Sequence, residues 1–175
     1  RKSIGEYLRT RHPLQPSHEG IDAPLLEWKA CFVTLLLHGE LRGCIGSLEP
    51  RESLLDNVAH NAVSAAFSDP RFSPVTADEF PLLHIDISVL GTPAVMNIQD
   101  EASLVRQLRP GVDGLILHAP NGARATFLPS VWEQLPDPQD FVMHLKRKAG
   151  LPANYWHEGM RAERYEVQYF EELSH

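Results

Sequence analysis

The chain has 175 residues, the length of one ordinary domain, and carries 16 Lys and Arg against 23 Asp and Glu, a formal net charge of -7. Hydrophobic residues make up 43% of it and charged residues 22%, enough apolar surface for a folded core, which excludes a disordered chain. The negative charge repels phosphate backbones, so nucleic-acid binding ranks last among the functions considered. The longest uncharged apolar run, 30–37, is far shorter than the roughly 20 residues of a membrane-spanning helix, so we expect no membrane span.

Cysteine and histidine usage indicates the compartment and argues against metal binding. The two cysteines, Cys31 and Cys44, form no CxxC or CxxH pattern and are too few for a disulfide scaffold, which suits a reducing cytoplasm. The nine histidines form no HxH or HxxxH pair. The first residues carry no signal-peptide pattern. We therefore expect a cytoplasmic protein with no metal and no cofactor.

The first elements predicted are a short helix, a loop and a β-hairpin. Apolar residues at helical spacing predict a helix over 3–11, and the Pro-, Ser- and Gly-containing stretch 14–24 predicts a loop. The apolar run 30–37 predicts a strand that turns at Gly39-Glu40 into a second strand. The N-terminal third is thus expected to supply one helix and one hairpin.

The turn at Gly39-Glu40 sets the register of this hairpin. It pairs Leu35 with Cys44 and Leu37 with Arg42, which puts Arg42 and Cys44 on the apolar face of the sheet. Cys31 then lies about 13 Å along the ladder from Cys44, too far for a disulfide. A guanidinium on an apolar face needs a buried carboxylate or a pocket, so this register carries a conflict at Arg42.

The next two elements are a well-marked helix and an alternating strand. Ser53 caps a helix whose apolar residues run to Phe67 at helical intervals. The strand 83–90 alternates apolar residues with His84, Asp86 and Ser88, and we expect its polar face to border a cleft. Side chains two apart on one strand point in parallel, so these three do not form a serine-hydrolase triad by themselves.

The second half continues the irregular alternation of helices and hairpins. Asp100 predicts the cap of a short helix, and 114–118 with 124–128 predict a hairpin around Asn121-Gly122. Asp137 and Gly150 bound a further helix, and 164–170 predicts a last strand. This order favours an α+β fold with antiparallel or mixed sheets packed by helices over a doubly wound one.

The most unusual segment is Leu-Arg-Gly-Cys-Ile-Gly at 41–46, where Gly43 and Gly46 flank Cys44 inside a predicted strand. Glycine weakens strands, so this pair predicts a bulge or a close backbone approach. Alternation places Arg42 beside Cys44, and a nearby guanidinium favours the nucleophilic thiolate. The alternative is a Cys44 packed in the core as a small apolar residue.

This hexapeptide resembles the signature of the AMMECR domain family, known in prokaryotes as the A component of the AmmeMemoRadiSam set. Further segments resemble blocks of that family in the same order: 61–62, 65–66, 69–72, 87–90, 114–117, 125–129, 131–132 and 147–151. The resemblance implies one AMMECR-like domain over 1–175, built of two intertwined small subdomains with a cleft beside 41–46. It leaves the activity unsettled and implies a Memo-like protein and a radical S-adenosylmethionine protein as partners.

Three polar residues after the hexapeptide join the candidate site. Asn61 shares the inward stripe of the helix, and a role in orienting substrate weighs equally with simple hydrogen bonding to backbone near the glycines. An ion pair between Asp69 and Arg71 that fixes the turn is favoured over direct ligand contact. A pair of Asp69 with Arg42 is the alternative that would resolve the conflict at Arg42.

The leading hypothesis is an enzyme or enzyme component acting on a small anionic substrate or in a modification or redox pathway. Arg42 binds the anionic group and Cys44 is the nucleophile or thiol carrier, and the remaining site residues contact the substrate: Gly43, Gly46, Asn61, Asp69 and Arg71. The rival hypothesis is a non-catalytic adaptor that docks a partner protein. Nucleic-acid binding is the third.

Overall fold

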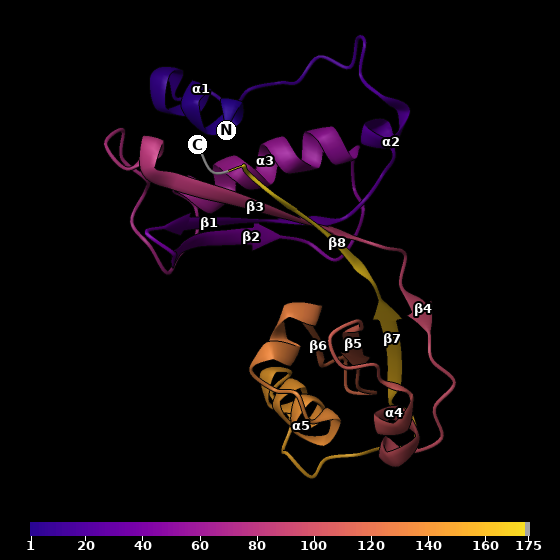
Figure 1. Ribbon diagram of the computed structural model, residues 1–175. Helices are drawn as coiled ribbons and strands as arrows, with labels where there is room; N and C mark the ends of the chain where they lie inside the picture. The colour runs from indigo at the N-terminus through magenta and orange to yellow at the C-terminus, as the bar shows by residue number, and fades with distance from the viewer. Residues whose placement is uncertain (174–175) are drawn as a thin grey trace. The chain divides into compact units, whose positions relative to one another are not determined.

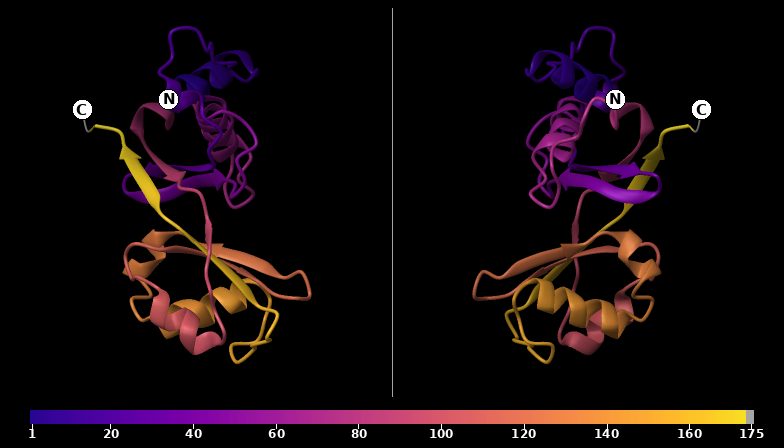
Figure 2. Two further views of the ribbon diagram at one scale, coloured as in Figure 1. Left: turned by 90° about the vertical axis from the view of Figure 1, so that its right-hand side faces the viewer. Right: turned by 90° about the vertical axis from the view of Figure 1, so that its left-hand side faces the viewer.

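The computed structural model describes residues 1–173, which divide into two compact units. Unit 1 comprises residues 1–90 and the C-terminal segment that begins at Gln168, and unit 2 comprises residues 91–167. Figures 1 and 2 show the chain leaving unit 1 once and returning to it as its last strand. Unit 1 is therefore assembled from two segments that lie far apart in the sequence.

Unit 1 is a four-stranded sheet with helices packed on one face. The sheet order is β2-β1-β3-β8, and helix α3 contacts β1 and β2 while α1 lies against α3 (Figure 1). The strand pairings β1–β2 and β1–β3 are antiparallel. The elements of unit 1 are α1 (Lys2–Thr10), α2 (Ala23–Leu26), β1 (Cys31–Leu37), β2 (Glu40–Gly46), α3 (Leu54–Phe67), η1 (Phe80–Leu82), β3 (Leu83–Leu90) and β8 (Val167–Glu171).

Small side chains let α3 approach the sheet closely. The core between them joins Val33 and Leu35 of β1 to the alanines of α3, which are almost fully buried: Ala62, Ala65 and Ala66. The helix begins where the sequence predicts, because the Ser53 hydroxyl accepts a hydrogen bond from the amide of Asp56. Burial of this apolar stripe stabilises the helix on the sheet at about 25 cal/mol per Å² of apolar surface.

The hairpin turns one residue earlier than predicted. His38 and Gly39 have φ values of 53 and 83°, the two positive values that a type I′ turn requires, and Leu37 pairs with Glu40. The register then shifts at a β-bulge, where Arg42 is the extra residue. Gly43 lies opposite Leu35, and Cys44 lies opposite Thr34. The predicted register was wrong because it assumed Gly39-Glu40 as the turn and no bulge.

The observed register changes the face of the sheet on which Cys44 lies. Thr34 alternates with the buried Val33 and Leu35, so Cys44 shares the face of the sheet that α3 does not cover. The predicted placement of Cys44 on the apolar face was therefore wrong, and Arg42, as the extra residue of the bulge, falls outside the alternation on which its predicted placement depended. Both cysteines are free.

Unit 2 is a second antiparallel sheet of order β4-β7-β5-β6 with its own core. Trp132 stacks on Phe141 at 3.8 Å between ring centroids, and Lys146 is fully buried in an ion pair with Glu101. The elements are β4 (Ala94–Val95), α4 (Glu101–Gln107), β5 (Gly114–His118), β6 (Arg124–Phe127), η2 (Pro129–Glu133), α5 (Pro138–Lys148) and β7 (Arg161–Tyr165).

Most element predictions for the second half are confirmed. Asp100 and Asp137 cap α4 and α5 through their side chains, and the hairpin forms as β5 and β6. The single strand predicted at 164–170 is instead two strands, β7 and β8, which separate at Glu166. The chain is an α+β protein with antiparallel sheets, as predicted, and no helix within residues 1–173 is long and apolar enough to cross a membrane.

Candidate functional site

The two glycines of the hexapeptide lie in close contact with the backbone of neighbouring elements. A Cβ atom on Gly43 would overlap the backbone carbonyl of Ala65 in α3, and one on Gly46 would overlap the Cys31 carbonyl and the Phe32 ring. The close approach predicted from the glycines is confirmed at both positions. Contact of Gly43 and Gly46 with a substrate remains a prediction.

Cys44 lies on β2, an edge strand of the unit 1 sheet, and is half-buried. Its Sγ accepts a hydrogen bond from the Thr34 hydroxyl at 3.3 Å. Its amide donates to Asp69 Oδ2 at 2.9 Å, and its carbonyl accepts from Arg71 Nη2 at 3.4 Å. The side chain and both backbone polar groups of Cys44 are thus held by three named residues.

The buried carboxylate of Asp69 organises this segment. It accepts hydrogen bonds from the Cys44 amide and from the Arg71 amide, Nε and Nη2, the last at 2.8 Å. The hydrogen bonds from the Arg71 guanidinium hold the pKa of Asp69 far below its usual range, against the effect of burial. The favoured prediction of an Asp69–Arg71 ion pair is confirmed.

Arg42 has a different carboxylate partner. Its Nε and Nη2 donate to Glu79 at 2.9 and 3.0 Å, and its side chain also reaches the carbonyls of Ser73 and Pro74. These hydrogen bonds from Arg42 lower the pKa of Glu79 to about 2. The alternative in which Asp69 pairs with Arg42 was wrong, and the predicted neighbourhood of Arg42 and the Cys44 sulfur does not form among the described contacts.

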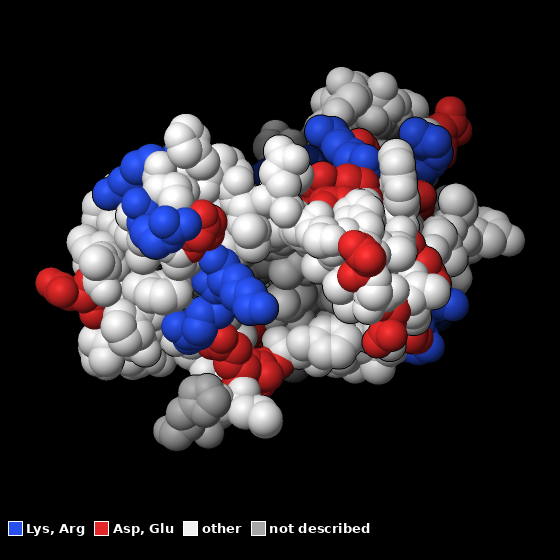
Figure 3. Space-filling view, turned by 90° about the horizontal axis from the view of Figure 1, so that it is seen from above, with Lys and Arg blue, Asp and Glu red and all other residues white. Residues whose placement is uncertain are grey.

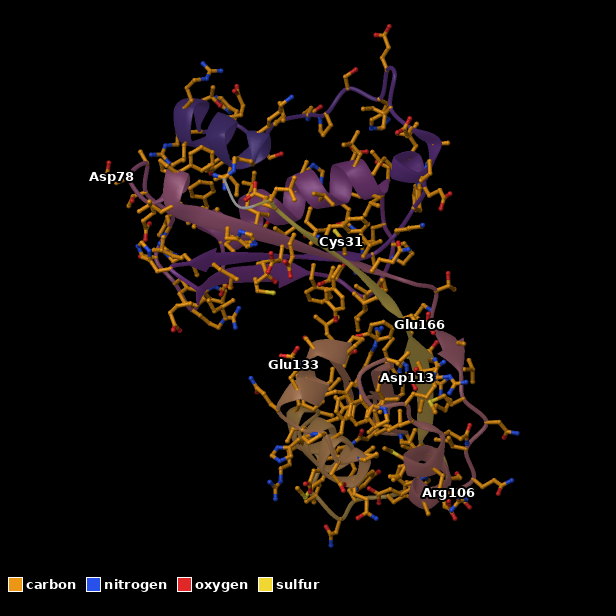
Figure 4. The ribbon with its side chains drawn as sticks, viewed as in Figure 1. Cys31, Asp78, Arg106, Asp113, Glu133 and Glu166 are labelled. Carbon is orange, nitrogen blue, oxygen red and sulfur yellow. The ribbon has the colours of Figure 1, made fainter. Side chains whose placement is uncertain are left out.

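Asn61 faces Cys31, not Cys44. Its Nδ2 lies 2.8 Å from Asn57 Oδ1, 3.2 Å from the Cys31 carbonyl and 3.4 Å from Cys31 Sγ. Cys31 lies between α3 and the sheet (Figure 4), and its burial raises the pKa of the thiol to about 11. The structure therefore supports the hydrogen-bonding alternative for Asn61, whose substrate-orienting role remains a prediction.

The polar residues of β3 share the face on which Cys44 stands. Thr34 of β1 has Cys44 as its partner on one side and Asp86 of β3 on the other. His84 Nε2 lies 3.0 Å from Asp86 Oδ1. The polar face of β3 was predicted from the alternation of its residues, but its neighbourhood with Cys44 was not, because the predicted register put the cysteine on the opposite face.

The cavities described in unit 1 lie away from the hexapeptide. One of about 320 Å³ is lined by Gln15, Pro16, His18, Asp56 and His60, and another of about 630 Å³ lies beside α1. The cleft predicted beside 41–46 remains a prediction. Within the described residues, no group of three or more His, Cys, Asp or Glu side chains is arranged to hold a metal ion.

The fold and site together define a class: two-unit α+β proteins with a glycine-flanked cysteine on an edge strand of one sheet. The model of the AMMECR1 family matches residues 1–170. The chain belongs to this family, as its hexapeptide indicated.

Archaeal relatives match nearly the whole chain. Protein MJ0810 of Methanocaldococcus jannaschii is 37% identical over 151 residues, which cover 84% of this chain and 75% of that protein. A protein of Methanothermobacter thermautotrophicus is 36% identical over 174 residues, covering 98% and 90%. The crystal structure of uncharacterized protein PH0010 from Pyrococcus horikoshii superposes with a TM-score of 0.87 at 31% identity, covering 98% of this chain and 86% of that one. The names of these three proteins state no activity.

Proposed function

We propose that the protein is a thiol-dependent enzyme or enzyme component in which Cys44 is the nucleophile or thiol carrier toward a small anionic substrate. The observation that carries this proposal is the hydrogen bond from the Thr34 hydroxyl to Cys44 Sγ, on the sheet face that α3 does not cover. A hydrogen bond donated to sulfur favours the thiolate, which is the nucleophilic form of cysteine.

Arg71 is the better candidate for binding an anion. Both guanidinium groups pair with a carboxylate, but the Arg42 side chain is only 11% exposed, whereas the Arg71 side chain is 54% exposed. The hydrogen bonds to Asp69 raise the pKa of Arg71, so its guanidinium stays charged, and its Nη2 lies 3.4 Å from the Cys44 carbonyl. We therefore assign anion binding to Arg71 and a structural role in the bulge to Arg42.

Alkylation of the native protein with iodoacetamide near neutral pH tests this proposal. We expect Cys44 to react faster than a free model thiol. Cys31 should stay unmodified, because it is fully buried and its pKa is about 11. Peptide mass spectrometry measures both rates in one sample, and Cys31→Ser and Cys44→Ser variants assign the signal to each thiol.

The adaptor alternative makes the opposite prediction for the same thiol. If Cys44 reacts only after unfolding, or no faster than a free thiol, the nucleophile assignment is wrong and a docking role is favoured. A Cys44→Ser variant would then bind partner proteins normally, including the Memo-like and radical S-adenosylmethionine proteins that the family resemblance implied. Under our proposal the variant folds and loses activity.

Nucleic-acid binding remains the last-ranked alternative. On the face seen in Figure 3, Lys and Arg side chains are interspersed with Asp and Glu and form no continuous basic surface. The formal net charge of -7 also disfavours binding to the negatively charged phosphate backbone of nucleic acid. A salt-sensitive affinity for nucleic acid would reverse this ranking.

A further inference from the structure

A tryptophan is exposed on unit 1, in the segment that links α2 to β1. Trp28 is 67% exposed and Leu25 of α2 is 40% exposed, whereas Trp132 in the core of unit 2 is almost fully buried. Tryptophan carries a large apolar surface, and it is enriched among the residues that dominate the energy of protein interfaces. Leu25 and Trp28 therefore form an apolar patch that suits contact with another molecule.

The backbone that carries Trp28 is fixed against the start of α3. The carbonyl of Glu27 accepts a hydrogen bond from the Leu54 amide at 2.8 Å, and the carbonyl of Lys29 accepts one from Asn57 Nδ2 at 2.9 Å. Figure 1 shows α2 beside this helix. A side chain on a fixed backbone loses less conformational freedom on binding than one on a mobile loop. Trp28 is thus held ready for a partner.

A polar cavity adjoins this patch. Trp28 forms a β-bridge with Ser53, whose hydroxyl donates a hydrogen bond to Asp56 Oδ2 at 2.6 Å. Asp56 lines the cavity of about 320 Å³ together with His18 and His60. The hydrogen bond from Ser53 lowers the pKa of Asp56, and the one from His18 lowers it further, so the carboxylate is charged at neutral pH. The cavity therefore offers a negative charge close to the exposed tryptophan.

The charge around the patch is mainly negative. Residues 17–29 and 51–60 include five carboxylates but only two Lys or Arg side chains, and each of the two already pairs with a carboxylate, Lys29 with Glu27 and Arg51 with Glu49. The five carboxylates are Glu19, Asp22, Glu27, Glu52 and Asp56. An apolar patch with negative surroundings is complementary to a partner surface that combines apolar and cationic side chains.

We propose that Leu25, Trp28 and the cavity at Asp56, together the Trp28 surface, bind a partner protein through a segment in which apolar side chains lie beside Lys or Arg. The apolar side chains cover Leu25 and Trp28, and a Lys or Arg side chain enters the cavity and pairs with Asp56. A second copy of the chain does not fit, because a two-fold interface would bring two negatively charged surfaces together. Binding at this surface does not depend on the role of Cys44.

Selection of displayed random peptides on the whole protein at low ionic strength tests this proposal. We expect the selected peptides to combine aliphatic or aromatic residues with Lys or Arg. Replacing Trp28 with Ser should weaken their binding at least about tenfold, as removal of a central aromatic anchor does in protein interfaces. Isothermal titration calorimetry with synthetic copies of the selected peptides measures the change.

Two further measurements test the role of charge. Raising the ionic strength from about 0.01 M to about 0.15 M shortens the screening length from about 30 Å to about 8 Å and should weaken binding of the same peptides. Asp56→Asn preserves the shape of the side chain but removes its charge, so it should weaken binding several-fold.

Leu82→Ser is the matched control, because Leu82 is 56% exposed on unit 1 but lies outside the Trp28 surface. This variant and Cys44→Ser should bind the peptides as the parent protein does, and circular dichroism should show that all variants fold. Failure to select any peptide, selection of peptides without Lys or Arg, or equal binding to Trp28→Ser would overturn the proposal. A dimer of the parent protein that Trp28→Ser dissociates, measured by sedimentation equilibrium, would overturn it too, since the occupant would then be a second copy.

Discussion

Replacing Gly43 with Ala should destabilise the protein by about 2–3 kcal/mol, the upper part of the usual range of about 1–3 kcal/mol for overpacking. The added Cβ would overlap the Ala65 carbonyl. Both overlapping atoms belong to or are attached directly to backbone, so the overlap cannot be relieved by rotating a side chain. Either α3 must move away from β2, losing apolar contact, or the bulge must open. The free energy of unfolding from urea titrations measures this loss.

Gly20→Ala is the control for the conformational cost of losing a glycine. Gly20 has a φ of 73°, but no atom lies within 4 Å of a Cβ built on it. We expect a loss of about 1 kcal/mol there, from backbone strain alone. Equal losses in the two variants would show that the contact of Gly43 with Ala65 does not limit the packing of α3.

Replacing Asp69 with Ala should cost about 2–3 kcal/mol, because the Cys44 amide loses its acceptor and Arg71 loses its buried partner. The Asp69 side chain is 2% exposed, so water does not readily replace the carboxylate. We also expect slower alkylation of Cys44, whose backbone Asp69 holds. Asp78→Ala removes an exposed carboxylate from the following loop, labelled in Figure 4, and should cost little.

The stabilisation by Asp69 should also depend on pH. Its folded-state pKa is depressed, so the contribution is complete above the unfolded-state pKa of about 4 and is lost as the pH falls below that value toward the folded-state pKa. Stability of the parent protein should therefore fall more steeply on acidification below about pH 4 than stability of Asp69→Ala. Parallel curves for the two proteins would contradict this assignment.

The helices were predictable because their signals are local. Ser53, Asp100 and Asp137 cap helices at the positions that the sequence indicates, and each cap needs only the following turn. The register of the first hairpin was not predictable in the same way. Two candidate turns overlap at Gly39, and the bulge at Arg42 has no counterpart in the alternation of apolar residues.

The error in register explains what was missed at the site. A shift of one residue exchanges the faces of a strand, so the predicted register did not show that Cys44, Thr34 and Asp86 lie side by side on one face of the sheet. The Asp69–Arg71 pair was predictable because the two residues are neighbours on one turn. The Arg42–Glu79 pair joins residues 37 positions apart, and no periodic signal connects them.

The hydrogen bonds from Cys44 to Asp69 and from Arg71 to Cys44 have a further consequence for β2. The rim of an open sheet normally presents bare amide and carbonyl groups that can recruit a strand from another molecule. At Cys44 both of these groups are already bound by side chains of the same protein. The residues that position the sulfur therefore also occupy the groups that a strand of another molecule would need at this point of β2.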